Sequence, residues 1–498
     1  MLDSLLHGLS IVFQEQNLIF CFIGVLLGTI VGTLPGIGPL ATISILLPLT
    51  YKTVDPIAAI ICLFGIFYGA QYGSSTAAIL FRLPGEPSSV MTAMDGHALS
   101  KKGKAGTALG ISAMASFTAG IISALVIACI TIPMGNLIFL FGPVEYTFMM
   151  FFILTMSVAL AVNSNLSSSS AMLLVGVLLS TVGTDITNGN TRFGFGIPEL
   201  VDGISFVLVA MAVFGSAEMI YNLLHIKKHE NKKNNLNKDF NPSKKDIKES
   251  AAPTLRGTVI GCIFGILPGT ASVISSFFAY MCEKLLSKNP NRFGKGELAG
   301  VAAPEAANNA AAQASIIPVL SLGIPTTALM TIMAAALATH GFQLGPQLIS
   351  QNQDFFWALV GSMLLGNIFL LILNLPLIGV WIKLLKLPTV YICTIGLAFC
   401  AIATYKFNNS WFDVALFFFL AAFGYLIRLL DLDPAPLALG MVIGPVFEEN
   451  MRRAIIVEQA NLIEIFSKPI GIIFLILSIC AVFIKLYSKL QYKKSLAL

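Results

Sequence analysis

Long apolar segments separated by short polar ones run along almost the whole chain, from Leu18 to Tyr487. One crossing of a bilayer as an α-helix takes about 20 apolar residues. The pattern therefore predicts roughly 11 to 13 full or partial crossings. We expect an all-α polytopic membrane protein that forms a single transmembrane domain over residues 1–498.

Glycine and proline interrupt the apolar pattern at two related places. The stretch "GTLPGIGPLATISILLPLT" begins at Gly32, and the stretch "FGILPGTASVISSFFAY" begins at Phe264. Their equivalent prolines, Pro35 and Pro268, lie 233 positions apart. Glycine costs the interior of a helix about 1 kcal/mol and proline about 3 kcal/mol. Both stretches are therefore predicted to break a membrane helix into two parts.

A second interruption follows in each half of the chain. It is "YGSSTAAILFRLPGEPSS", with Pro84, in the first half and "NNAAAQASIIPVLSLGIPTT", with Pro325, in the second. These prolines are 241 positions apart, close to the first offset, which indicates an internal duplication. We place the first repeat at residues 1–225 and the second at 251–498, joined by a basic cytoplasmic linker at 226–250.

The basic residues of the loops indicate how the two repeats are oriented. Between its interruptions the first repeat carries one basic residue, Lys52, whereas the second carries four within residues 284–295. After the second interruption the pattern reverses, with three lysines in residues 101–104 and no basic residue in 341–354. Because basic loops stay on the cytoplasmic side, equivalent loops are predicted on opposite sides. Such inverted repeats with broken helices and re-entrant hairpins are typical of secondary transporters.

The composition agrees with a membrane protein. The 498 residues are 56% hydrophobic and only 11% charged, whereas soluble domains have about 25% charged residues. The net charge of +5 does not indicate a nucleic-acid partner, because the positive charge is gathered in short loops and in the linker. The eight cysteines form no CxxC pair, so we expect buried thiols rather than disulfides or a metal site.

The first interruption of each repeat has the composition of an anion site. In "TLPGIGP" and "ILPGTAS", glycine lets the backbone turn and proline ends the incoming helix. The outgoing helix then begins with free N–H groups and a partial positive charge, which attract an anion. We expect Thr270 and Ser272 to cap that helix or to bind the ligand. The alternative is a packing kink made by glycine and proline.

Polar residues stand in apolar surroundings beside the second interruption. The hydroxyl residues at 74–76 can bond to carbonyls of their own helix. Asn308 and Asn309 are predicted to coordinate a ligand or cation rather than to join helices. Glu305, which follows a proline, lies either in the first turn of a helix or at an intramembrane functional site.

The segments "RLPGEPSS" and "GIPTTA" place proline and glycine before hydroxyl residues, a pattern typical of a hairpin tip that opens a new helix. The serines at 88–89, Thr326 and Thr327 can cap such helices and donate hydrogen bonds to a carboxylate. Arg82 either binds an anionic substrate, pairs with Glu86 or extends to the membrane interface.

Motifs of membrane ATPases and membrane enzymes do not stand out in the sequence. The chain has no GxxxxGK[ST] phosphate loop, which excludes an ATPase of that type. No HExxH, CxxC pair or GxSxG favours a catalytic site. We therefore expect that the chain is not an enzyme.

Long motifs make the chain resemble the large membrane subunit of the bacterial tripartite tricarboxylate transporters. They include "LPGEPSSVMTAMDGHALSKKGKAGTALG", "TRFGFGIPELVDGI", "RFGKGELAGVAAPEAANNAAAQASIIPVLSLGIPTTA" and "LGMVIGPVFEENMRRA". The resemblance implies a multi-pass permease of the bacterial inner membrane. It also implies two separate partners, a small membrane subunit and a periplasmic solute-binding protein. The energy source would be a gradient of Na⁺ or H⁺, with no cofactor besides that ion.

The interruptions and the resemblance together indicate where a carboxylate substrate binds. The residues expected there are Pro35, Gly36, Gly38, Ser74, Ser75, Thr76, Arg82, Pro84, Gly85, Pro268, Gly269, Thr270, Gly323, Pro325 and Thr326. For the coupling ion we expect Asn308, Asn309 and Thr76. The chain departs from the family pattern at Ser74, Arg82 and Thr326, which leaves the identity of the carboxylate open.

We expect this chain to import a di- or tricarboxylate with a Na⁺ or H⁺ gradient. Two other classes of protein stay open. One is a membrane receptor that only docks the binding protein, and the other is a passive anion channel. Association of several copies of the chain is open as well.

The inverted orientation predicts that single cysteines replacing Lys52 and Lys288 are labelled from opposite sides of the membrane. A membrane-impermeant thiol reagent, applied to right-side-out and to inverted vesicles, makes the comparison. Labelling of both positions from one side would contradict the inverted repeat.

Overall fold

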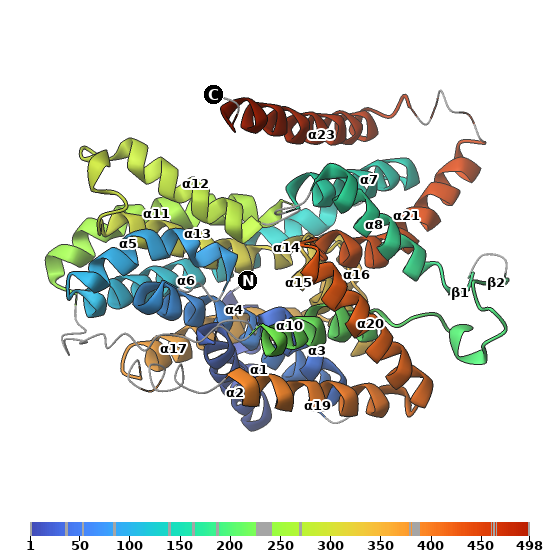
Figure 1. Ribbon diagram of the computed structural model, residues 1–498, viewed down its shortest axis with the longest axis horizontal. Coiled ribbons are helices and arrows are strands. Elements are labelled where there is room, and N and C mark those ends of the chain that lie inside the picture. Colours follow the sequence, from blue (N-terminus) through green and yellow to red (C-terminus); the bar gives the residue numbers. More distant parts are fainter. Residues whose placement is uncertain are drawn as a thin grey trace.

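The computed structural model describes residues 2–34, 38–51, 54–82, 86–137, 141–161, 165–185, 189–225, 242–267, 271–377, 380, 389–459, 461, 464 and 466–496. Within these residues the regular structure is almost entirely helical (Figure 1). The one sheet of this part of the chain pairs two short antiparallel strands, with Gly183 opposite Arg192. The prediction of an all-α polytopic protein is confirmed.

The elements of the first part of the chain precede the linker region. They are α1 Leu2–Val12, α2 Glu15–Thr33, α3 Pro39–Thr50, α4 Pro56–Phe81, the 3-10 turn η1 Pro87–Ser89, α5 Val90–Lys101, α6 Ala105–Leu137, α7 Pro143–Leu160, α8 Leu166–Ser180, β1 Gly183–Thr184, β2 Thr191–Arg192, the 3-10 turn η3 Pro198–Leu200, α9 Phe206–Ala210, the π-helical turn η4 Met211–Ser216 and α10 Ala217–Leu224.

The elements of the second part begin inside the predicted linker. They are α11 Lys244–Ile266, α12 Ala271–Leu286, the 3-10 turn η5 Pro290–Arg292, α13 Ala299–Ala314, α14 Ile316–Leu322, α15 Ala328–Thr339, α16 Pro346–Gln351, α17 Gln353–Asn374, α19 Thr389–Asn408, α20 Trp411–Leu429, α21 Ala435–Val457 and α23 Pro469–Leu496. The end of the 226–250 segment is thus helical. The reason is a local cap, because the Ser243 hydroxyl accepts a hydrogen bond from the backbone N–H of Asp246 at 3.2 Å.

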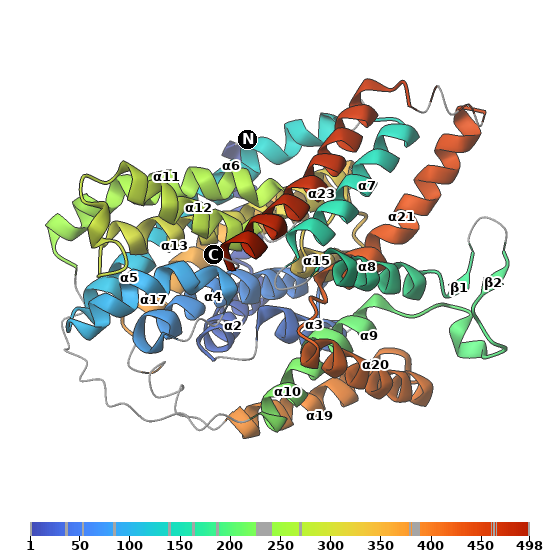
Figure 2. The same cartoon turned by 45° about the horizontal axis from the view of Figure 1, so that its top comes forward.

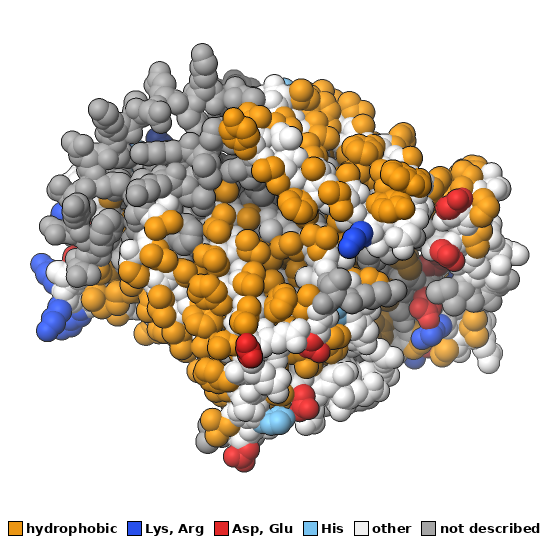
Figure 3. All heavy atoms as spheres, turned by 90° about the horizontal axis from the view of Figure 1, so that it is seen from below, with side chains coloured by type: hydrophobic (Ala, Val, Ile, Leu, Met, Phe, Trp, Pro, Cys, Tyr) orange, Lys and Arg blue, Asp and Glu red, His pale blue; other side chains and the backbone are white. Residues whose placement is uncertain are grey.

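Apolar helices suited to a membrane make up much of the structure. By length and composition, six helical segments of the described chain can cross a bilayer: α2, α4, α6, the segment 206–224, α17 and α20. Shorter apolar helices add α3, α7, α8, α15, α19 and α23. Figure 3 shows hydrophobic side chains spread over much of one face. Exposed hydrophobic side chains of α19 include Ile395, Phe399 and Ile402, all about half exposed or more.

The first interruption separates helices in both halves, as the sequence predicts. Helix α2 ends at Thr33, and Leu34 is already extended, with φ −89° and ψ 113°. The equivalent Leu267 after α11 is also extended, with φ −80° and ψ 143°. Helices α3 and α12 begin a few residues later. Because proline and glycine act on the local backbone, these breaks follow from short-range chemistry.

Three glycines spaced four residues apart on α2 lie directly against the backbone of α4. A Cβ atom at Gly28 would stand 2.4 Å from the carbonyl oxygen of Ile66, so no other residue permits this approach. The flanking glycines make the same contact, Gly24 with Cys62 and Gly32 with Ala70. Small residues on helix faces allow such close packing in membranes, where the hydrophobic effect contributes little between helices.

Helices α11 and α13 repeat this packing in the second half. A Cβ atom at Gly261 would stand 2.4 Å from the carbonyl oxygen of Ala307, and the neighbouring contacts are Gly257 with Ala303 and Gly265 with Ala311. The glycines are displaced by 233 positions from those of α2, and their partners by 241 from those of α4. These are the offsets of the two proline pairs. An internal duplication predicts this repetition.

Asp95 of the first half makes a buried polar contact with the second half. Asp95 of α5 is fully buried and accepts hydrogen bonds from the Tyr280 hydroxyl and from the backbone N–H groups of Gly294, Gly296 and Glu297, at 2.7 to 3.0 Å. The segment after the second interruption of one half therefore packs against the segment between the interruptions of the other.

The segment between the interruptions of the first half likewise contacts the segment after the second interruption of the second half. Thr50, at the end of α3, lies with its hydroxyl oxygen 3.3 Å from Nε2 of His340, which follows α15. The segments joined by Asp95 share one more contact, in which the Lys102 ammonium group donates a hydrogen bond to the backbone carbonyl of Lys295. Two basic segments, which the positive-inside rule assigns to the cytoplasmic side, are thus neighbours.

Elements of the two halves alternate through the molecule rather than forming separate lobes. Figures 1 and 2 show α5 and α6 beside α11, α12 and α13, while α7 and α8 lie beside α21. The two-stranded hairpin projects at the end that carries α8 and α21 (Figure 2).

The glycine contacts predict that Gly28→Ala and Gly261→Ala each lower the thermal stability of the purified protein. The added methyl group has no space, and overpacking of this kind costs about 1–3 kcal/mol. Thermal unfolding in detergent measures the effect. Gly135→Ala is the control, because the nearest atom to a Cβ there is 3.9 Å away. Equal melting temperatures for all three variants would contradict the packing argument.

Candidate functional site

A cavity of about 700 Å³ lies where four helical segments begin. Its lining includes Gly38 and Pro39 before and in α3, Glu86 and Pro87 at η1, Ala271 and Ser272 of α12, and Thr327 and Ala328 at α15. These starts come from both interruptions of both halves. Free N–H groups and the partial positive charge of helix starts attract anions. The volume falls in the range of small-molecule sites.

Several of the predicted site residues lie outside the described residues. They are Pro35, Gly36, Pro84, Gly85, Pro268, Gly269 and Thr270. Their described neighbours, such as Gly38 and Ser272, line the cavity. The assignment of these positions to substrate binding stays a prediction.

Two threonines at the start of α15, Thr326 and Thr327, differ in their hydrogen bonds. Thr327 is the cap of the helix, because its hydroxyl accepts a hydrogen bond from the backbone N–H of Met330 at 3.1 Å. Thr326 is buried, and its hydroxyl has no hydrogen-bond partner among the described residues. Gly323 ends α14 in the left-handed region with φ 74°, and Pro325 is buried. Thr327 lines the cavity, whereas Thr326 is not among its lining residues.

The corresponding turn of the first half is fastened to α4. The Ser74 hydroxyl accepts from the backbone N–H of Glu86 at 2.9 Å and lies 2.8 Å from the hydroxyl of Ser89. Gln71 donates to the Glu86 carboxylate at 2.8 Å, and both side chains line the cavity. Ser74 therefore positions the turn, and Gln71 and Glu86 are site residues absent from the predicted set.

Arg82 does not line the cavity. It ends α4 in the left-handed region with φ 58° and is exposed. No ion pair joins Arg82 to Glu86 in the part of the chain that the structure describes. The basic residue of the described cavity lining is Arg428 of α20 instead, which pairs with Glu218 of α10 at 3.1 Å.

Arg428 of α20, Glu218 of α10 and Asp433, which lies between α20 and α21, all come from outside the interrupted motifs. In the sequence, Arg428 ends an apolar helix, a position that many interfacial arginines share. Nothing in its local pattern marks it as a cavity residue. Only the packing of α10 and α20 beside the start of α3 reveals it.

Glu305 is the centre of a buried polar network. It is the seventh residue of α13, so the alternative of a first-turn position is wrong. The carboxylate is fully buried and accepts hydrogen bonds from Ser75 at 2.6 Å, Ser116 at 2.9 Å, Thr92 at 3.0 Å and Asn309 at 3.1 Å. Four helices meet at this one side chain: α4, α5, α6 and α13. Ser116 and Thr92 were not singled out from the sequence.

Amide groups beside this network lack partners. Both side-chain amide atoms of Asn308 and the Oδ1 atom of Asn309 are buried without a hydrogen-bond partner among the described residues. The same holds for Nε2 of Gln313, whose Oε1 accepts from Ser123 at 2.9 Å. A buried unpaired polar group costs about 1–3 kcal/mol. Native structures contain few such groups, so each calls for a partner that the described residues do not supply. Thr76 is buried one position after Ser75 on α4.

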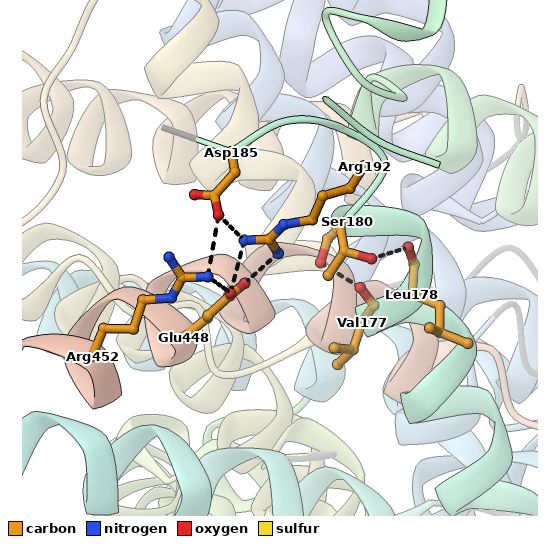
Figure 4. A network of polar contacts seen from close by, with 8 residues as sticks. Val177, Leu178, Ser180, Asp185, Arg192, Glu448 and Arg452 are labelled. Atoms are coloured by element: carbon orange, nitrogen blue, oxygen red, sulfur yellow. Dashed lines mark hydrogen bonds and ion pairs between the residues drawn. The ribbon is translucent and has the colours of Figure 1, made fainter. Parts of the chain in front are cut away.

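A second charged cluster lies away from the cavity, at the two-stranded hairpin. Arg192 binds Glu448 with two hydrogen bonds of 3.0 and 3.1 Å and also contacts Asp185, while Arg452 joins both carboxylates (Figure 4). The hydrogen bonds and charge of Arg192, aided by Arg452, lower the pKa of Glu448. The motifs "TRFGFGIPELVDGI" and "LGMVIGPVFEENMRRA" are thus joined in space.

An all-α membrane protein with a cavity lined by the starts of interrupted helices has the architecture of a membrane transport protein. The sequence model of the tripartite tricarboxylate transporter TctA family matches residues 18–439. The chain therefore belongs to this family and is a component of a tripartite tricarboxylate transporter.

Two relatives come from Agrobacterium vitis. The first, an uncharacterized 52.8 kDa protein in the TAR-I ttuC' 3' region, is 42% identical over 99% of this chain and 98% of its own length. The second, an uncharacterized protein in the TAR-II ttuC' 3' region, is 41% identical over 47% of this chain and 97% of its own length. No solved structure matches the chain.

The cavity predicts that Gly38→Leu lowers substrate uptake without lowering stability. A Cβ atom at Gly38 has no atom within 4 Å, so the leucine side chain fits the fold and fills cavity space. We expect at least about a tenfold loss of uptake, since about 1.4 kcal/mol of lost binding already gives that factor. Gly38→Ala is the matched control with a smaller loss. Wild-type uptake in the leucine variant would separate this cavity from the transport route.

Proposed function

We propose that the chain is the permease subunit of a secondary transporter that imports a di- or tricarboxylate. A Na⁺ or H⁺ gradient drives the import across the bacterial inner membrane. A periplasmic binding protein delivers the substrate, and a small membrane subunit completes the system. Membership of the TctA family supports this assignment.

The observation that carries the proposal is the meeting of four helical starts at one cavity. The charged side chains of the described lining are Arg428 and three acidic groups, Glu86, Glu218 and Asp433. Side chains alone therefore supply little positive charge. Backbone N–H groups at the helix starts are the better source of attraction for a carboxylate. A cation taken up with the substrate reduces the remaining negative charge.

Contacts between the halves support the inverted orientation of the repeats. Asp95 holds residues 294–297, and Thr50 meets His340. In each contact, the segment between the interruptions of one half touches the segment that follows the second interruption of the other. An inverted repeat places these two segments on the same side of the membrane.

The unpaired amides support a coupling-ion site. Asn308 and Asn309 lie on α13 within one helical turn of the buried Glu305. Amide oxygens are ligands for hard cations. We assign the coupling ion to these two residues, with Thr76 as a further candidate.

Uptake of labelled citrate into proteoliposomes tests the proposal. The chain is reconstituted with its small subunit and binding protein, and an inward Na⁺ or H⁺ gradient is imposed. We expect accumulation above the external concentration with one of the gradients, because a coupled transporter moves its substrate uphill. The same series with other labelled di- and tricarboxylates decides the substrate.

The other two classes of protein give different results in this experiment. A passive anion channel equilibrates its substrate and responds to voltage without needing a particular cation. A docking subunit assembles with its partners but moves no carboxylate. Either result would overturn the proposed symport.

A further inference from the structure

We propose that Glu305 is the charged residue of a monovalent-cation site and that it positions the Asn309 amide for that ion. The inference rests on the proposed coupling of import to Na⁺ or H⁺. It adds a residue to the site and gives the site a negative charge.

The orientation of the Asn309 amide depends on Glu305. Its Nδ2 atom donates to the Ser116 hydroxyl at 2.8 Å and to both the carboxylate and the backbone carbonyl of Glu305 at 3.1 Å. Turning the amide over would bring its oxygen against the carboxylate, where like partial charges repel. Glu305 thereby determines which atom of the amide stays without a hydrogen-bond partner among the described residues, and that atom is Oδ1.

The Oδ1 atom of Asn309 is therefore available to coordinate an ion. Oδ1 of Asn309 and Oδ1 of the adjacent Asn308 are buried and accept no hydrogen bond from the described part of the chain. The Asn309 oxygen belongs to an amide whose nitrogen is bonded to the Glu305 carboxylate, so an amide oxygen and a carboxylate, both donors that hard cations prefer, lie on one turn of α13.

The charge of Glu305 is not balanced by a basic side chain in the described structure. All four of its side-chain donors are neutral, namely three hydroxyls and one amide. An isolated buried carboxylate is costly unless a counter-charge is close. The described residues contain no group of three or more His, Cys, Asp or Glu side chains that could hold a metal ion. One negative charge therefore calls for one positive charge, which suits Na⁺ or H⁺ better than a divalent ion.

Another buried glutamate provides the contrast. Glu283 of α12 is also buried, but Arg256 binds it with two hydrogen bonds of 2.5 and 2.8 Å. Its charge is already balanced. A Glu283→Gln variant therefore measures the effect of losing a buried carboxylate that is not part of the proposed ion site.

The test compares the wild-type chain with Glu305→Gln, Glu305→Asp and Glu283→Gln. Thermal unfolding of the full chain is recorded against NaCl concentration, with choline chloride at equal ionic strength as the reference. An ion that binds the folded state raises the melting temperature with its concentration. Uptake with the complete transporter is measured against pH in parallel.

If Na⁺ is the ion, we expect the wild type to be stabilised by Na⁺ and Glu305→Gln to need at least tenfold more. Glu305→Asp, which keeps the charge but displaces it, should fall between them. Glu283→Gln should lose stability but keep the wild-type Na⁺ response. If H⁺ is the ion, Na⁺ has no effect on the wild type. In that case Glu305→Gln removes the pH dependence of uptake, and Glu283→Gln retains it.

A Glu305→Gln variant with wild-type Na⁺ response and pH profile would overturn the inference while leaving coupled transport intact. If that variant does not fold, an unchanged Na⁺ response and pH profile in Glu305→Asp would overturn it as well. A wild-type chain that depends on neither ion would overturn the proposed symport itself, and this inference with it. The wild-type measurement thus separates the two failures.

Discussion

Close contact between helix backbones is the constraint on which the rest of this structure depends. On α2 and α11, glycines every fourth residue bring the chain to within touching distance of the carbonyls of α4 and α13. Larger residues would hold these helices apart by the width of a side chain. The helices that come next in the chain after α2 and α11, namely α3 and α12, begin at the cavity. Packing of small residues thus sets the place where the broken helices meet.

The polar groups inside this frame divide into two kinds. Asp95, Ser74 and Thr327 are satisfied by backbone groups and hold turns in place. Asn308 and Thr326 are buried with side-chain atoms that no described residue pairs. The first kind builds the fold, since each hydrogen bond offsets the cost of burial. For the second kind, a bound substrate or ion that supplies the missing partner would offset the cost of burial.

The local chemistry of the chain predicts much of the fold. The helix breaks after Thr33 and Ile266 follow from glycine and proline, and the two offsets of the duplication reappear in the glycine contacts. The cap at Thr327 was one of two hydroxyls singled out beside a proline and glycine. The breaks and the cap depend on residues within a few positions of one another, and the duplication is visible as a repeated motif. That is why the sequence pattern indicates them.

The sequence by itself determined the membrane class, the broken helices and the duplicated motifs, because composition and short-range backbone preferences suffice for these. Only the tertiary structure decided which side chains share a site. Ser75 and Glu305 are 230 positions apart, and Arg428 reaches the cavity from a helix with no special motif. Glu305 also lies inside its helix rather than at the start, because α13 begins at Ala299 and runs through Pro304. Such partnerships depend on which helix faces meet, and a linear pattern does not contain that information.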